Sequence, residues 1–177
     1  TLDTTKLESY LTEAKLFNVP GRVFPIVIEN HEVETADAIS QMLHDPRCPL
    51  NILVFLPGMG SIRSLQAQLN NTVSSGIEII PLHSSLPKKD QNKAFIGANR
   101  KIILSTNIAE TSLTIPNITG VVDTGTERRA SFAPWSGMPL LQLEKISQAS
   151  AIQRAGRAGR VQSGLVFRTY HQNDFTQ

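Results

Sequence analysis

Short apolar runs rich in Ile, Val and Leu alternate along the chain with longer amphipathic stretches. Several runs are apolar at successive positions, which is typical of strands in a parallel sheet covered on both faces. The predicted strands are 24–29, 51–56, 77–82, 101–106, 118–123 and 164–170, and the predicted helices are 32–44, 59–74, 87–96 and 147–158. This alternation predicts an α/β fold, a doubly wound and mostly parallel sheet with helices on both faces.

The first 20 residues depart from this alternation. They predict a short helix at Lys6–Ala14 and a turn at Pro20-Gly21. We interpret residues 1–20 as a lead-in and residues 21–177 as the main domain.

A second departure, at residues 124–146, has the pattern of a β-hairpin. Two extended runs, Thr126–Phe132 and Pro139–Ile146, flank the turn signal Pro134-Trp135-Ser136-Gly137. We expect this hairpin to project from the main sheet.

Composition narrows the class of protein. The length of 177 residues (19.4 kDa) suits one domain. Hydrophobic residues make up 40% of the chain and charged residues 18%, a composition that excludes a mainly disordered chain. Cys48 is the single cysteine, which excludes a disulfide framework and favours a reducing compartment. No apolar run approaches the ~18 residues of a membrane span and no signal pattern opens the chain, so we expect a cytoplasmic protein without a membrane partner.

The net charge of +2 is unevenly distributed. Residues 1–45 hold eight acids and three bases, whereas residues 126–160 hold six bases and two acids. The basic segment indicates an anionic partner such as phosphate or nucleic acid, and a solvated charged surface is the alternative.

The most informative stretch is Gln153–Arg160. On a helix, Gln153, Arg157 and Arg160 would form one stripe, with Arg154 one position round. The opposite positions are small or apolar and could lie close against a sheet: Ala149, Ile152, Gly156 and Gly159. Guanidinium groups suit phosphate oxygens and a glutamine can orient a water molecule. A solvated basic helix would explain the arginines but not the small residues.

Polar residues follow the predicted strand 101–106 where that strand ends. Ligands of open α/β sheets bind outside the carboxyl ends of the strands. The segment offers hydroxyls and one amide for phosphate or sugar: Ser105, Thr106, Asn107, Thr111, Ser112 and Thr114. Capping of the next helix is an equally simple use of these side chains.

Two further turns, Pro57-Gly58 and His83-Ser84-Ser85, could present backbone N–H groups to a phosphodiester. A complete nucleotide site is missing from the sequence, because Gly58-Met59-Gly60 lacks the lysine and hydroxyl of a phosphate loop and no Asp-Glu pair follows a strand. The histidines lack ligand spacing, so no metal site is expected: His31, His44, His83 and His171.

These motifs together resemble those of one family, the DEAH-box branch of superfamily-two RNA helicases. Gln153–Arg160 (QRAGRAGR) resembles motif VI, with Ile146–Ser150 before it; Ser105–Ile115 resembles motif V and Leu53–Gly58 motif IV. The similarity covers nearly the whole chain, and Thr1-Leu2-Asp3 resembles the tail of motif III. The resemblance implies the second RecA-like lobe of a bacterial-type ATP-dependent RNA helicase, beginning at the junction between the lobes and ending before the C-terminal domains.

The resemblance implies ATP with Mg²⁺, held mainly by a first lobe, and an isolated chain without activity. Arg157 and Arg160 would be arginine fingers on the β- and γ-phosphates, and Gln153 would orient the attacking water. Ser112 would sense the γ-phosphate, Thr114 would approach the ribose and Phe95 would stack on the base. Pro116 stands where relatives often carry an acid for the ribose, so that contact would rest on Thr114.

The resemblance also implies a single-stranded RNA partner. Its backbone would contact residues from three places in the chain: Gly58, Ser84-Ser85 and Thr106-Asn107. The hairpin at 124–146 resembles the strand-separating hairpin of the family. Two alternatives are an RNA-binding scaffold lobe without turnover and a DNA-directed translocase, because backbone contacts do not distinguish RNA from DNA unless the 2′-OH is read.

Overall fold

The computed structural model describes residues 24–132 and 135–171, together with residues 9–11, 15 and 17. The predicted helix at Lys6–Ala14 falls largely outside the described residues, and the predicted turn at Pro20-Gly21 lies wholly outside them.

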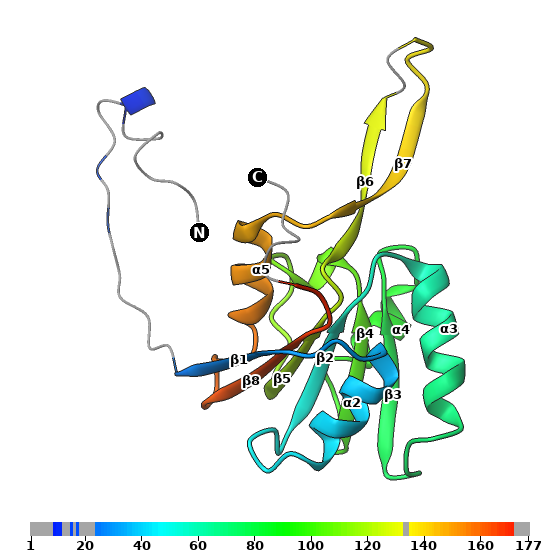
Figure 1. Ribbon diagram of the computed structural model, residues 1–177, viewed down its shortest axis with the longest axis vertical. Helices are drawn as coiled ribbons and strands as arrows, with labels where there is room; N and C mark the ends of the chain where they lie inside the picture. Colours follow the sequence, from blue (N-terminus) through cyan, green and yellow to red (C-terminus); the bar gives the residue numbers. More distant parts are fainter. Residues whose placement is uncertain (1–8, 12–14, 16, 18–23, 133–134, 172–177) are drawn as a thin grey trace.

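Six strands form one sheet in the order β1-β8-β5-β2-β4-β3, and every neighbouring pair is parallel (Figure 1). The strands are β1 (Ile26–Asn30), β2 (Asn51–Phe55), β3 (Ile77–Leu82), β4 (Arg100–Ser105), β5 (Ile118–Asp123) and β8 (Gly164–Arg168). Each coincides with a predicted strand to within two residues at either end. The predicted doubly wound parallel sheet is therefore confirmed.

Helices cover both faces of this sheet. They are α2 (Thr35–His44), α3 (Met59–Asn70), α4 (Lys88–Asn92) and α5 (Gln148–Ala155), with a 3₁₀ turn at Asn107–Ala109. Strand β2 is buried at all five positions, and its alternate residues belong to two apolar clusters, one on each face of the sheet. Ile52 and Val54 pack with α2 and α3, whereas Leu53 and Phe55 pack with the face that includes α5. No helix in the described ranges is long and apolar enough to cross a membrane.

The predicted hairpin forms a two-stranded sheet of its own. Strands β6 (Thr126–Phe132) and β7 (Pro139–Lys145) pair in antiparallel register, with Arg128 opposite Leu143. The hairpin extends away from the main sheet beyond the carboxyl end of β5 (Figure 1). Its predicted strands are confirmed to within one residue.

Candidate nucleotide and nucleic-acid sites

The predicted helix 147–158 is shorter in the structure. Helix α5 ends at Ala155 and residues 156–161 form turns, so the prediction that Arg157 and Arg160 continue a helical stripe was wrong. Gly159, within these turns, leaves no room for a side chain, because a methyl group there would lie 2.8 Å from the carbonyl oxygen of Phe24 and from Cγ1 of Ile26. The turns thus bring the chain against the start of β1, where the N–H of Phe24 donates to the carbonyl of Gly159 (3.0 Å).

The inward side of α5 also differs from the prediction. Ala149 and Ile152 are exposed, whereas Ala151, Arg154 and Ala155 are buried. The helix is therefore rotated so that a charged residue faces the sheet. Carboxylates on neighbouring segments make this rotation possible.

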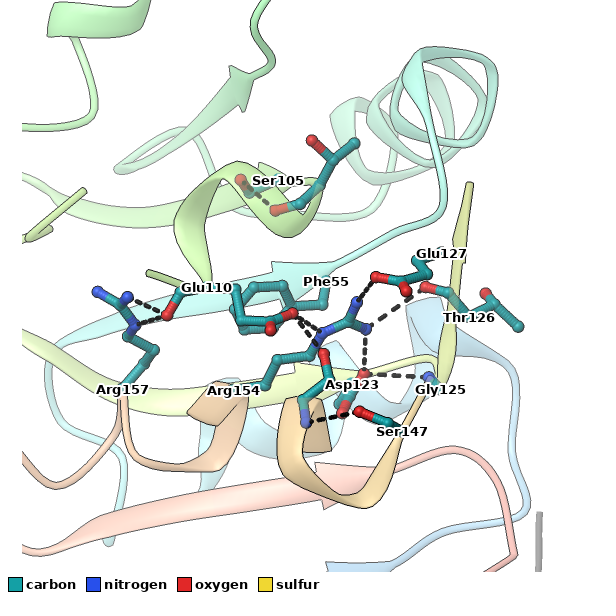
Figure 2. A network of polar contacts seen from close by, with 12 residues as sticks. Phe55, Ser105, Glu110, Asp123, Gly125, Thr126, Glu127, Ser147, Arg154 and Arg157 are labelled. Carbon is teal, nitrogen blue, oxygen red and sulfur yellow. Dashed lines mark hydrogen bonds and ion pairs between the residues drawn. The ribbon is translucent and has the colours of Figure 1, made fainter. Parts of the chain in front are cut away.

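Arg154 is 1% exposed and lies among three acids (Figure 2). Its guanidinium is 2.9 Å from Oδ1 of Asp123, 3.1 Å from Oε2 of Glu110 and 3.6 Å from Oε2 of Glu127. It also lies over the ring of Phe55, 4.9 Å from the centroid. Burial disfavours the charged form, but the carboxylates of Asp123 and Glu110 outweigh it, so the pKa of Arg154 lies above its ordinary value. Arg154 fastens α5 to the core.

Glu110 joins the segment after β4 to the arginine-rich segment. Its side-chain Oε2 accepts from Oγ of Ser150 (2.5 Å) and from Nε of Arg154 (3.1 Å). Its main-chain carbonyl accepts from Nε of Arg157 (2.8 Å). One residue is therefore attached to α5 at two positions and to the following turn at a third.

Arg157 is 5% exposed and is held by main-chain carbonyls. Nε and Nη2 both donate to the carbonyl of Glu110, and Nη1 donates to that of Leu113 at 2.5 Å. Burial and then the charge of Arg160 lower the pKa of Arg157 to about 10, which leaves the guanidinium charged at pH 7.

The three residues proposed for catalysis border one open hollow of about 370 Å³, which we call the arginine hollow. Arg160 is exposed there and Gln153 is half-buried. The lining residues are Glu110, Thr111, Ile152, Gln153, Gly156, Arg157 and Arg160. Helix α5 and the turn after it thus bring Gln153, Arg157 and Arg160 to the same hollow, although the three residues do not lie on one continuous helix.

A second hollow, of about 810 Å³, follows the carboxyl ends of β2, β3 and β4, and we call it the strand-end groove. It brings together four of the five residues predicted to contact RNA, Gly58, Ser84, Thr106 and Asn107. It is completed by Pro57, Met59, Gly60, His83, Ile108, Thr111, Ser112, Arg128 and Leu141. Ser85, the fifth, turns toward His83, whose Nδ1 is 2.8 Å from Oγ of Ser85.

The predicted nucleotide contacts occupy several places. Ser112 lines the strand-end groove, and Thr114 is exposed on the segment before β5. Phe95 is half-buried against the apolar cluster on the α5 side of the sheet. The backbone beside it is held by Lys101, whose buried Nζ donates to the carbonyls of Lys93 (2.7 Å) and Ile96.

Sequence reasoning missed the roles of Arg154 and Glu110. No group of three or more His, Cys, Asp or Glu side chains in the described ranges could hold a metal ion. The acids nearest the arginine-rich segment instead surround Arg154.

A doubly wound parallel sheet with polar groups at its carboxyl edge and an arginine-rich turn beside them defines a RecA-like lobe. The chain belongs to the helicase conserved C-terminal domain family, whose family model matches residues 34–162.

Relatives agree with this assignment. The chain is 41% identical over 176 residues to the ATP-dependent RNA helicase HrpB of Escherichia coli (strain K12), covering 93% of this chain and 22% of that protein. It is 40% identical over 198 residues to the probable ATP-dependent RNA helicase DHX34 of Homo sapiens, covering 99% of this chain and 17% of that one. The chain thus spans about a fifth of the length of these relatives.

A solved structure supports the assignment of the RecA-like fold. The crystal structure of Escherichia coli DEAH/RHA helicase HrpB superposes with a TM-score of 0.89 at 38% identity, covering 98% of this chain and 23% of that one. The RecA-like fold is therefore shared with a DEAH/RHA helicase. Together with the family model and the relatives, this confirms the resemblance to the C-terminal lobe of bacterial-type DEAH helicases.

Proposed function

We propose that this chain is the second motor lobe of an ATP-dependent RNA helicase. The observation that carries the proposal is the arrangement of the two hollows. Gln153, Arg157 and Arg160 border one, four predicted RNA contacts line the other, and Thr111 borders both. Such a lobe supplies cations to a triphosphate and holds a nucleic-acid strand at the same time.

In the proposed reaction, Arg160 and Arg157 stabilise the charge that develops on the transferred phosphoryl group. An arginine finger contributes about 10³–10⁵ in rate. Arg160 is exposed and can meet an incoming anion directly. Arg157 must exchange its hydrogen bonds to the carbonyls of Glu110 and Leu113 for phosphate oxygens. Gln153, beside them, orients the attacking water.

This exchange of hydrogen bonds by Arg157 would couple nucleotide binding to the binding of the nucleic-acid strand. The carbonyls that Arg157 would release belong to the segment 110–113, and Thr111 and Ser112 of this segment line the strand-end groove. Closure on ATP would then change the groove, and by linkage a bound strand would change the affinity for ATP.

The residues of this lobe fit a phosphate group but not a complete nucleotide site. The sequence has no phosphate loop and no Asp-Glu pair, so the first lobe of the intact protein would hold ATP and Mg²⁺. Mg²⁺ would neutralise charge on the phosphates. The first lobe and the C-terminal domains of the same protein are the proposed protein partners, and the single buried Cys48 fits a cytoplasmic location.

The test is the ATPase activity of the full-length protein that carries this lobe, measured alone, with single-stranded RNA and with single-stranded DNA of the same sequence. We expect stimulation by RNA. A stronger response to DNA would favour a DNA translocase, and strand binding without hydrolysis would favour a scaffold lobe. The 177-residue chain alone should not hydrolyse ATP, and turnover by the purified chain would contradict the two-lobe proposal.

A further inference from the structure

We infer that Arg128, in the first strand of the hairpin, binds a phosphate of the single strand that occupies the strand-end groove. This inference rests on the proposed function and adds a residue from an element separate from the main sheet. Five observations about Arg128 and its neighbours support it.

The first observation is its position. Arg128 and Leu141 are the groove-lining residues that come from β6 and β7, and most of the others follow β2, β3 and β4. Arg128 therefore brings a residue of the hairpin into the lining of the groove.

The second is its contact with Gly58, a predicted RNA-binding residue. A methyl group at position 58 would lie 3.2 Å from both Cδ and Nε of Arg128. Gly58 has an extended backbone with φ of 179°, so any residue could adopt its conformation. The glycine instead makes room for the arginine, and the guanidinium lies against the turn after β2.

The third is charge. Among the described residues that line the groove, Arg128 is the one permanently charged side chain, and none is a carboxylate. His83 is the other titratable group there. An anion bound in this groove would be attracted by the guanidinium of Arg128 and would not be repelled by a carboxylate of the lining.

The fourth is the state of the guanidinium. Arg128 is exposed, and within the described ranges its side chain makes no hydrogen bond or ion pair. Its N–H donors are available in a planar fork that matches two phosphate oxygens. The adjacent Arg129 points to the other face of the hairpin, where it pairs with Glu127 (3.4 Å) and Glu144 (3.5 Å).

The fifth is anchoring. The residues just before Arg128 are attached to the core, because Arg154 donates to the carbonyl of Thr126 (3.4 Å) and pairs with Glu127 (3.6 Å). Arg128 therefore projects from a fixed point of the hairpin. A contact with phosphate from this position is independent of base sequence.

The experiment measures binding of a fluorescent oligouridylate to the full-length protein by anisotropy over a range of salt concentrations. For single strands, each phosphate contact adds about 0.7 to the slope of log affinity against log salt. Arg128→Ala should weaken binding several-fold at low salt and lower that slope by about 0.7. Arg128→Lys should retain the slope, because it keeps the charge.

Arg129→Ala is the matched control, since it removes the same side chain one residue away on the other face. Equal slopes for Arg128→Ala, Arg129→Ala and the unchanged protein would overturn the inference. Asn107→Ala separates this outcome from failure of the proposed function. If Asn107→Ala weakens binding and Arg128→Ala does not, the groove binds the strand without Arg128; if neither does, the strand does not use the groove.

Discussion

Nη1 of Arg154 lies 2.9 Å from Oδ1 of Asp123, and both side chains are 1% exposed. This ion pair connects α5 to the end of β5 inside the core. Tyr170 donates to the other carboxylate oxygen of Asp123 at 3.1 Å. A buried charge with its partners removed is strongly destabilising, and the surrounding acids make this pair sensitive to substitution.

Arg154→Ala should therefore destabilise the lobe by about 3–5 kcal/mol, because it leaves Asp123 and Glu110 without their buried counter-ion. Urea unfolding of the 177-residue chain, followed by circular dichroism, measures the change. Arg129→Ala is the control, because the side chain of Arg129 is 57% exposed, so the loss of its ion pairs with Glu127 and Glu144 should have little effect. A loss below 1 kcal/mol for Arg154→Ala would show that the network contributes little to stability.

Gly159→Ala should cost about 1–3 kcal/mol, since the added methyl would meet the carbonyl of Phe24 and the side chain of Ile26. The same unfolding experiment tests it. Gly76→Ala is a suitable comparison, because nothing lies within 4 Å of the added methyl. Equal stability of the two variants would refute close packing of the turn against β1.

Arg157→Ala and Arg160→Ala should differ in the full-length protein. Both should lower kcat by about 10³ or more, as expected for removal of an arginine finger. Arg157→Ala should also raise the RNA concentration needed for half-maximal stimulation, because Arg157 holds the segment 110–113 beside the groove. Steady-state ATPase assays over a range of RNA concentrations measure both quantities. A near-normal kcat for Arg160→Ala would remove that residue from the finger role.

Phe95→Ala should weaken nucleotide binding by the full-length protein if its ring stacks on the base. The variant should also lose some stability, because Phe95 packs on the apolar cluster. Phe95→Leu retains most of the apolar contact and separates the two effects. Equilibrium binding of a fluorescent nucleotide is the measurement, and unchanged affinity in both variants would reject stacking.

Arg47→Ala should make stability depend less on pH in acid. The hydrogen bonds from Arg47 hold the pKa of Asp45 and of Glu29 below their ordinary values of 3.8 and 4.5, although partial desolvation opposes this. Their stabilisation is complete above about pH 4.5 and is lost as the pH falls through the lowered values. The variant should thus be less stable than the unchanged chain at pH 7, and the difference should diminish as the pH falls through the lowered pKa values of Asp45 and Glu29. Arg63→Ala, on an exposed face of α3, should show no such dependence.

The sheet could be predicted because its strands are short buried runs whose apolar character depends on local sequence alone. The helix at 147–158 was predicted too long because the periodic pattern continues past Ala155, where the chain of the structure turns and brings Gly159 against the start of β1, over 130 residues earlier in the chain. The role of Arg154 could not be predicted either. Its partners Glu110, Asp123 and Glu127 come from separate segments that only the folded sheet brings together.

That the residues predicted to contact RNA lie close together could be foreseen, because they follow strands whose carboxyl ends meet at one edge. Four of them gather in the strand-end groove for this reason. The place of Arg128 in this groove could not be predicted, because sequence alone does not reveal which of two neighbouring arginines is paired with acids.

Thr111 forms part of the wall of both hollows. If the arginine hollow receives a triphosphate and the strand-end groove a nucleic-acid strand, as we propose, a shift of this shared wall toward one hollow would enlarge the other. Coupling between the two ligands would then need no long-range relay, because one short stretch of chain borders both sites.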